Sequence, residues 1–178
     1  MYRCLIANRG EIAVRIIRAC RELGIETVAI YAKGDEASLH VSLADQAICI
    51  GEANPLDSYL NIERIIGAAE LSGANAIHPG YGFLSESTTF AEKVEENDIH
   101  FIGPNKKTME LMGDKITARQ TVDAAGVPVI PGSKDAVNNV SEIEKLAEDI
   151  GYPVVLKAAS GGGGKGIRIV KDPADLEK

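Results

Sequence analysis

The first hundred residues alternate short apolar runs with longer segments of helical periodicity, and this alternation limits the possible folds more than any other feature. Each apolar run has only four to six residues, which is typical of a buried strand in a parallel sheet. Parallel neighbours need a crossover connection, so strands that alternate with helices indicate βαβ units and an α/β fold. The expected strands are 3–7, 26–31, 46–50, 74–77 and 99–103.

Helices are expected between these strands. The first has apolar residues at positions 12, 16, 19, 20 and 23, and Gly24 ends it. A second is expected over 59–71, before Gly73, and a third over 88–96. Two shorter helices are expected after "GPNKKT" (103–108), where glycine and proline interrupt the pattern.

A second unit is expected after a linker at 128–139. Ser141 and Glu144 have the spacing of a capping box and predict the start of a helix. A strand "PVVLKAA", a glycine run and a strand "GIRIV" follow. The pattern therefore predicts one complete α/β domain and the start of another.

Composition narrows the class of protein. A formal charge of -7 argues against broad nucleic-acid binding, which needs clustered Lys and Arg. The apolar run before Asn8 is shorter than the core of a signal peptide, which has about 7–15 residues. A cytoplasmic protein without a membrane partner is expected. Cys4, Cys20 and Cys49 lie in apolar stretches, form no close pair and are expected to be reduced core residues.

Four consecutive glycines, 161–164, stand between Lys157 and Lys165. With Gly166 they form a G-x-G-x-x-G pattern, but a β-branched segment follows where a dinucleotide site needs a helix. A Walker A loop would need Ser or Thr at 166. The favoured interpretation is a hairpin loop whose backbone N–H groups approach nucleotide phosphates. A linker or a purely structural turn is the alternative.

Lys157 occupies an otherwise apolar strand segment, "VVLKAA". An unpaired lysine is costly to bury, so a ligand phosphate is one expected partner. The alternative is a side chain that faces solvent from an edge strand. Both interpretations stay open at this point.

Six segments match one protein family in order and spacing: "IANRGEIAVRIIRACRELGI", "HPGYGFLSE", "FIGP", "MGDKITAR", "GVPVIPGS" and "GYPVVLKAASGGGGKGIRIV". The chain resembles biotin carboxylases of the ATP-grasp superfamily over nearly its whole length. Another ATP-grasp ligase, such as a carbamoyl-phosphate synthetase, lacks "HPGYGFLSE" in this form. The resemblance implies a Rossmann-like, parallel-sheet pre-ATP-grasp domain at 1–113, a helix and linker at 114–140, and the start of an ATP-grasp lid domain at 141–178.

The resemblance also implies an activity. Such enzymes use ATP, Mg²⁺ and bicarbonate to carboxylate biotin on a carrier protein through carboxyphosphate. The expected parent is the ligase subunit of acetyl-CoA carboxylase, which serves fatty acid biosynthesis as a homodimer with a biotin carboxyl carrier protein and carboxyltransferase subunits. Pyruvate or propionyl-CoA carboxylase is the alternative. The 178 residues alone are expected to be inactive, as an inert folding or dimerisation module.

Individual site residues follow from the same motifs. Lys115 and Lys157 match lysines that contact nucleotide phosphate, and the loop residues match the phosphate flap. The turn "HPGYGFLSE" is expected to line the biotin pocket. The ATP-binding candidates are Lys115, Lys157, Gly161, Gly162, Gly163, Gly164, Lys165 and Gly166, and the biotin-pocket candidates are Tyr81, Gly82 and Glu86.

Four further positions carry expectations. Arg18 and Glu22 are four residues apart, so they either pair along their helix or lie at the family's dimer interface. His78 is expected to stabilise its turn rather than contact a ligand. Ser87 stands where the family usually has Asn, which leaves the local hydrogen bonding open. The family's catalytic residues and magnesium ligands would lie beyond Lys178, so no catalytic or metal residue is expected in this chain.

Overall fold

The structure is a computed structural model that describes residues 2–133, 135–137, 139–157 and 166–176. The chain forms two compact units, Met1–Met109 and Glu110–Lys178, and each is described by itself. None of the helices among the described residues is both long and apolar enough to cross a membrane.

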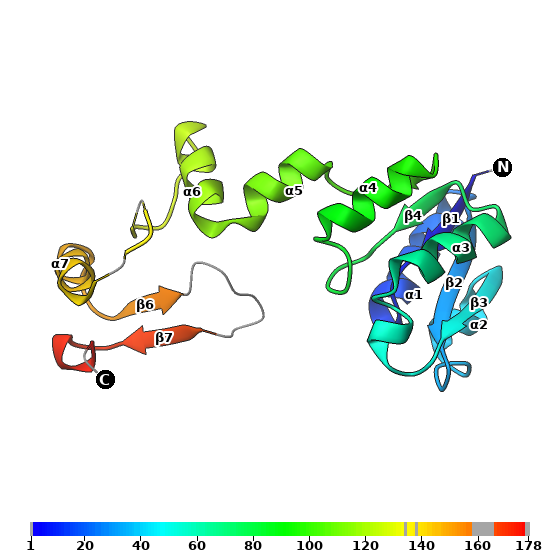
Figure 1. The fold of residues 1–178 in the computed structure, drawn as a ribbon, viewed down its shortest axis with the longest axis horizontal. Coiled ribbons are helices and arrows are strands. Elements are labelled where there is room, and N and C mark those ends of the chain that lie inside the picture. The colour runs from blue at the N-terminus through cyan, green and yellow to red at the C-terminus, as the bar shows by residue number, and fades with distance from the viewer. Residues whose placement is uncertain (1, 134, 138, 158–165, 177–178) are drawn as a thin grey trace. The chain divides into compact units, whose positions relative to one another are not determined.

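The first unit is built on a five-stranded, fully parallel sheet with the strand order β3-β2-β1-β4-β5 (Figure 1). β1 lies at the centre, because Cys4 pairs with Thr27 on one side and with Ala76 on the other. The expected α/β class and parallel sheet are confirmed. The strands are β1 (Arg3–Ile6), β2 (Glu26–Ala32), β3 (Gln46–Gly51), β4 (Ala76–His78) and β5 (His100–Phe101).

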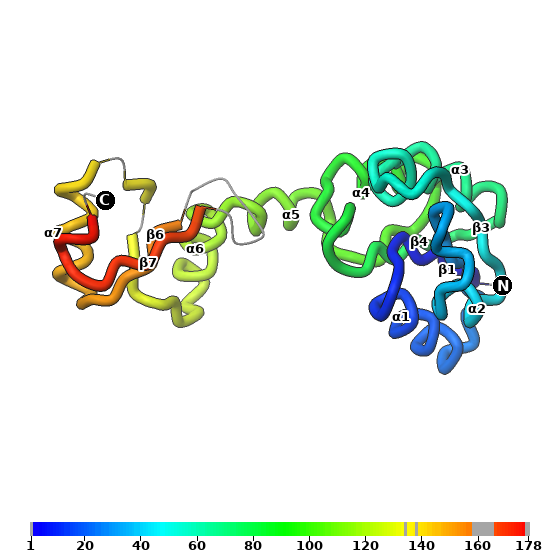
Figure 2. Tube along the Cα trace, turned by 90° about the horizontal axis from the view of Figure 1, so that it is seen from below, coloured from blue at the N-terminus to red at the C-terminus, as the bar shows by residue number. Residues whose placement is uncertain are grey.

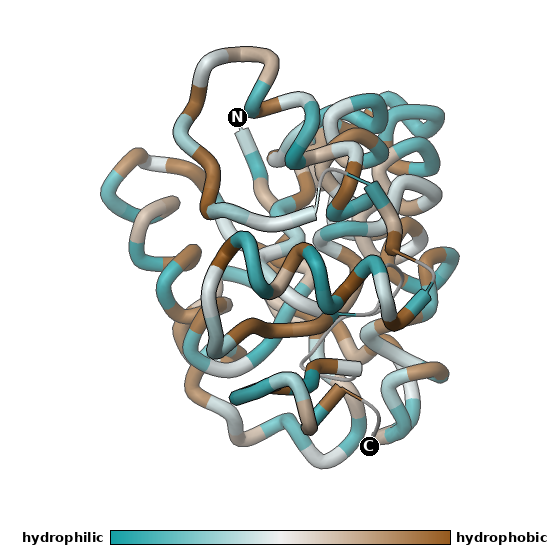
Figure 3. The backbone as a smooth tube through the Cα atoms, turned by 90° about the vertical axis from the view of Figure 1, so that its left-hand side faces the viewer, coloured by the Kyte–Doolittle hydropathy of each residue, from teal (hydrophilic) through white to brown (hydrophobic). Residues whose placement is uncertain are grey.

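Helices cover both faces of this sheet. In Figure 2, α1 (Gly10–Glu22) and α2 (Leu39–Leu43) lie on one side, and α3 (Ile62–Ser72) and α4 (Thr88–Glu96) on the other. Successive residues of β1 point to opposite faces, so Cys4 and Ile6 pack against α1 whereas Leu5 joins the core under α3 and α4. Apolar segments recur along the helices in Figure 3, as expected for amphipathic elements.

The second helix begins later than expected. Asn61 caps α3 by accepting a hydrogen bond from the Arg64 N–H at 3.1 Å, so the helix begins at Ile62 rather than at residue 59. Tyr59 is buried outside the helix, after the short 3-10 helix η1 (Pro55–Asp57). The five residues of α2 are too few to show a helical period and were not expected.

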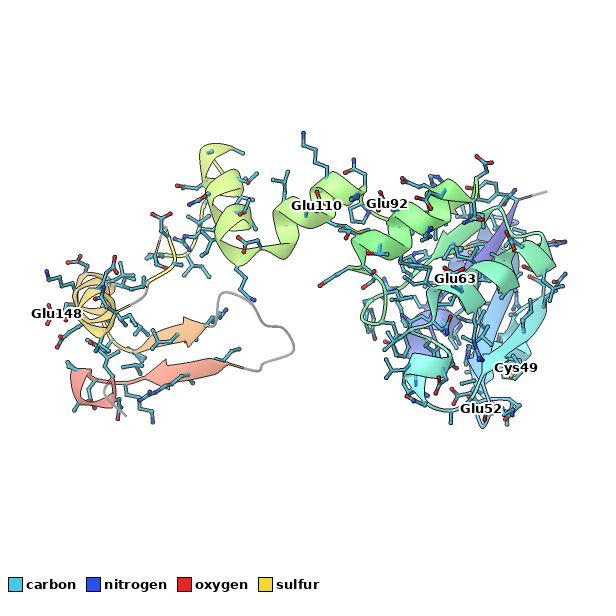
Figure 4. All side chains as sticks on the ribbon, in the orientation of Figure 1. Cys49, Glu52, Glu63, Glu92, Glu110 and Glu148 are labelled. Atoms are coloured by element: carbon cyan, nitrogen blue, oxygen red, sulfur yellow. The ribbon has the colours of Figure 1, made fainter. Side chains whose placement is uncertain are left out.

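The three cysteines have different environments. Cys4 and Cys20 are buried together, and burial raises the pKa of the Cys4 thiol to about 12 and also raises the pKa of Cys20. Both therefore remain neutral thiols, as expected of core residues. The same expectation is wrong for Cys49 (Figure 4), because Ala47 and Cys49 share one face of the edge strand β3 and both are exposed there.

The second unit ends in the expected antiparallel hairpin. β6 (Val154–Lys157) pairs with β7 (Ile167–Val170), and the register sets Lys157 opposite Ile167. The other elements are α5 (Lys106–Gly113), which begins in the first unit, α6 (Lys115–Ala124), α7 (Val140–Ile150) and η2 (Pro173–Asp175).

The capping box predicted at Ser141 and Glu144 is wrong by two residues. Asn139 is the N-cap of α7: its Oδ1 accepts from the Glu142 N–H at 2.8 Å, and its Nδ2 donates to the Glu142 carboxylate at 3.2 Å. Asn is as good an N-cap as Ser, and Asn139 with Glu142 has the same spacing. The earlier pair therefore sets the start of the helix.

Candidate functional site

Asn8 joins two loops at the carboxyl edge of the sheet. It follows β1, and its Nδ2 donates to the carbonyl oxygens of Pro79 and Tyr81, both at 2.8 Å. Its side chain is buried, with 4% of the residue exposed. Ligands of open parallel sheets bind at this edge, so the turn that Asn8 contacts is the first candidate site.

The turn needs glycine where it passes Asn8. Gly80 has φ +65°, and a Cβ added there would lie 2.8 Å from Asn8 Nδ2, which excludes larger residues. His78 Nδ1 accepts a hydrogen bond from the Gly80 N–H at 3.0 Å, and burial lowers the pKa of His78. His78 therefore stabilises the turn as a neutral imidazole, as expected from the sequence.

The three biotin-pocket candidates lie on this one turn. Tyr81, Gly82 and Glu86 are all exposed, and the Tyr81 hydroxyl donates to the carboxylate of Glu11 on α1. Ser87 ends the turn by capping α4, since its Oγ accepts from the Phe90 N–H at 3.2 Å. Ser and Asn are comparable caps, so Ser87 keeps the hydrogen bonding of this position intact.

A second cluster beside the turn was not predicted from the sequence. Arg9 forms an ion pair with Asp35 at 3.1 Å and lies over the ring of Tyr59, 5.3 Å from its centroid. Tyr59 Oη donates to Asp35 at 2.6 Å and accepts from the Ala32 N–H at 3.0 Å. The Tyr59 ring stacks on Phe83 with centroids 5.2 Å apart. The sequence did contain a sign of this cluster, because Asp35 is an acidic residue just after a buried strand.

Electrostatics at Asp35 follow from these contacts. Burial raises the pKa of the Asp35 carboxyl, but hydrogen bonds from Tyr59 and Arg9 outweigh that effect, and the pKa lies below its ordinary value. Burial, together with Asp35, raises the pKa of Tyr59. The cluster is therefore a charged carboxylate bound by a neutral phenol and a guanidinium.

Arg18 and Glu22 lie on the exposed face of α1. They line a groove of about 730 Å³ between α1 and α2, together with Arg15, Leu39 and His40. Among the residues that the structure describes, no ion pair joins Arg18 to Glu22. The structure thus gives no support to an Arg18–Glu22 pair along α1. The exposed groove is compatible with a dimer interface.

The nucleotide candidates lie in the second unit. Lys115 is the first residue of α6, which Asp114 caps by accepting from the Thr117 N–H at 2.8 Å. Lys157 is exposed at the end of β6, so the expected cost of burying it does not arise in this structure. Gly166 is described and exposed, whereas Gly161, Gly162, Gly163, Gly164 and Lys165 lie outside the described residues.

An apolar surface adjoins Lys157 and was also missed. Val155 pairs with Ile169, and Lys157 pairs with Ile167, so these four side chains lie on one face of the hairpin. Val155, Ile167 and Ile169 are 51%, 50% and 61% exposed. A cation beside an open apolar surface suits a ligand that has both a phosphate and a flat ring. The alternation of side chains between the two faces of each strand could have predicted this apolar surface.

Metal ligands are not grouped in the parts of the chain that the structure covers. Across residues 2–133, 135–137, 139–157 and 166–176, no set of three or more His, Cys, Asp or Glu could hold a metal ion.

Comparison with known proteins decides the family. Residues 1–109, more than half of the chain, match the family described as "Biotin carboxylase, N-terminal domain". The chain belongs to the biotin carboxylase family. Residues 114–178 match the family described as "Carbamoyl-phosphate synthase L chain, ATP binding domain", which is consistent with an ATP-grasp segment after the first unit.

Individual biotin carboxylases are similar along almost the entire chain. "Biotin carboxylase 1" of Bacillus subtilis is 56% identical, over 98% of this chain and 39% of that protein. The small subunit of 2-oxoglutarate carboxylase from Hydrogenobacter thermophilus is 55% identical, over 98% of this chain and 37% of that protein. A biotin carboxylase structure from Campylobacter jejuni has a TM-score of 0.89 at 51% identity, covering 98% of this chain and 39% of that one. The chain thus spans about two fifths of these relatives.

We predict that Asp35→Asn changes how the stability of this biotin carboxylase chain depends on pH. The pKa of Asp35 in the folded state lies below the ordinary 3.8, so its stabilising effect is present above that pH and is lost as the pH falls through the folded-state pKa. The free energy of unfolding of the wild type should therefore approach that of Asp35→Asn between about pH 5 and pH 2. Urea unfolding followed by circular dichroism measures this.

Glu95→Gln, at an exposed position on α4, is the matched control. It keeps the Asp35 cluster, so its free energy of unfolding should still fall over this pH range as that of the wild type does. A difference between wild type and Asp35→Asn that stays constant over this pH range would contradict the assignment of a stabilised carboxylate.

Proposed function

We propose that this chain is the N-terminal portion of a biotin carboxylase, which uses ATP, Mg²⁺ and bicarbonate to carboxylate biotin on a carrier protein. The observation that carries the proposal is the exposed turn with Tyr81, Gly82 and Glu86, fixed at the carboxyl edge of a parallel sheet. Identity above 50% to biotin carboxylases over 98% of the chain supports it. A similar biotin carboxylase domain, from Hydrogenobacter thermophilus, is described in complex with MgADP, ADP and bicarbonate.

The proposed reaction explains why such an enzyme needs a nucleotide site as well as a biotin site. Bicarbonate is a poor electrophile, because its carbon carries a delocalised negative charge. Phosphoryl transfer from ATP produces carboxyphosphate, a mixed anhydride that can deliver carbon dioxide to the ureido nitrogen of biotin. Positioning and charge stabilisation dominate phosphoryl transfer, which suits lysines and a glycine-rich backbone. Bound Mg²⁺ would offset phosphate charge, through ligands expected beyond Lys178.

In this proposal the second unit binds the nucleotide. Lys115, Lys157, Lys165 and the loop glycines 161–164 and 166 contact the phosphates, through ammonium groups and backbone N–H groups. The apolar surface beside Lys157 covers the flat face of the base. Exposed branched residues on the same face as an exposed lysine support this arrangement.

The proposal extends to the assembly. We assign the parent to acetyl-CoA carboxylase, acting in the cytoplasm in fatty acid biosynthesis with a biotin carboxyl carrier protein and carboxyltransferase subunits. Arg18 and Glu22 then lie at a homodimer interface, for which the groove between α1 and α2 provides the surface. A pyruvate, propionyl-CoA or 2-oxoglutarate carboxylase is the alternative, and the 2-oxoglutarate relative at 55% identity keeps it open.

The full-length parent should release ADP in a biotin-dependent reaction. Incubated with ATP, Mg²⁺ and bicarbonate, it should form ADP faster when free biotin is added, because biotin accepts the carboxyl group and completes the turnover. A coupled ADP assay measures the rates. If neither biotin nor bicarbonate stimulates ADP release, the proposed function is wrong.

Lys157→Ala in the full-length parent should raise the KM for ATP by about tenfold to a hundredfold, because a hydrogen bond to a charged group contributes roughly 1.5–3 kcal/mol. Lys145→Ala removes another exposed lysine of the same unit and should leave that KM unchanged. Steady-state ADP release at varied ATP measures both. Equal KM values for Lys157→Ala and wild type would count against the phosphate contact.

A further inference from the structure

Among the described residues, the side chain of Asn8 forms hydrogen bonds to the backbone of its own loop and of the turn after β4. Its two amide hydrogens serve the carbonyls of Pro79 and Tyr81, and its Oδ1 accepts from the Arg9 N–H at 2.9 Å. A buried amide with this many satisfied bonds is rigid, because breaking any one leaves a polar group unpaired. Asn8 therefore fixes the backbone on both sides of Gly80 and at Tyr81 itself.

The turn has a conformation that needs such support. Gly80 and Gly82 have φ of +65° and +68°, and Phe83, which has a side chain, has φ +29°. A positive φ at a bulky residue is unfavourable and persists only where the surroundings enforce it. The backbone conformation of Phe83 is enforced by stacking of its ring on Tyr59, with 5° between the ring planes. Asn8 acts on residues 79–81 and the stack acts on Phe83, so the two contacts fix successive parts of one turn.

We propose that Asn8 is a positioning residue for biotin binding. Its two hydrogen bonds to the turn hold Tyr81 in position. This inference rests on the proposed function, because it takes the exposed turn as one wall of the biotin pocket. Asn8 is buried and its amide is already committed to the protein backbone, so it acts through Tyr81 rather than on substrate. Loss of these bonds lets the turn leave its strained conformation, and biotin binding then has to restore it.

The effect should be selective for biotin. The nucleotide candidates Lys115 and Lys157 belong to the other compact unit, Glu110–Lys178. A change at Asn8 that acts through the turn should therefore raise the KM for biotin and leave the KM for ATP unchanged. A general loss of stability would instead reduce the amount of active enzyme, which lowers kcat without separating the two KM values.

The test uses the full-length parent carrying Asn8→Ala, with ADP release measured at varied free biotin and varied ATP. We expect the KM for biotin to rise about tenfold, since two hydrogen bonds that order the turn are lost, and the KM for ATP to stay within about twofold. The matched control is Asn75→Ala. Asn75 Oδ1 accepts from a backbone N–H of β1, that of Arg3 at 2.9 Å, at the amino end of the sheet. It should change neither KM.

Asn8→Ser provides a second variant in case Asn8→Ala does not fold, since Ser keeps a polar atom but cannot reach both carbonyls. The proposal is overturned if a folded Asn8 variant keeps the wild-type KM for biotin, or if both KM values rise together. Wild-type enzyme without biotin-stimulated ADP release would refute the proposed function, and the role of Asn8 with it. Active wild-type enzyme with unchanged biotin dependence in the variants would refute the role of Asn8 alone.

Discussion

Parallel pairing of β1 with both β2 and β4 is the constraint on which the rest of the first unit depends. It brings the loops after these three strands to one edge of the sheet, where Asn8, Asp35 and the turn 79–86 meet although they are far apart in the sequence. The same pairing buries β1 on both faces, so helices must cover each side. The sheet therefore both creates the core and places the candidate biotin-binding turn.

The acidic side chain after the second strand is already engaged by its neighbours at that edge. In dinucleotide-binding folds the acidic residue after the second strand contacts the ribose, whereas Asp35 is occupied by Arg9 and Tyr59. Tyr59 in turn supports Phe83 by stacking. Groups that could have contacted a cofactor instead hold the turn in shape, and we propose that this turn forms part of the biotin site.

Elements with a strong local signal were predictable, and contacts between distant residues were not. The strands of the parallel sheet and the hairpin of β6 and β7 follow from apolar runs and alternation, and Gly73 ended α3 as expected. The N-cap of α7 was misplaced because Asn139 and Ser141 offer the same local chemistry. The roles of Asn8 and Tyr59 depend on partners tens of residues away, which only the folded sheet brings together.

Transfer of labelled carbon tests the account most directly. The full-length parent, given ¹⁴C-bicarbonate, ATP, Mg²⁺ and free biotin, should form acid-labile labelled carboxybiotin, and omission of ATP should abolish the label. That result would place the chain in an enzyme that carboxylates biotin. ADP formation without label in biotin would contradict the account, because the enzyme would then cleave ATP for another acceptor.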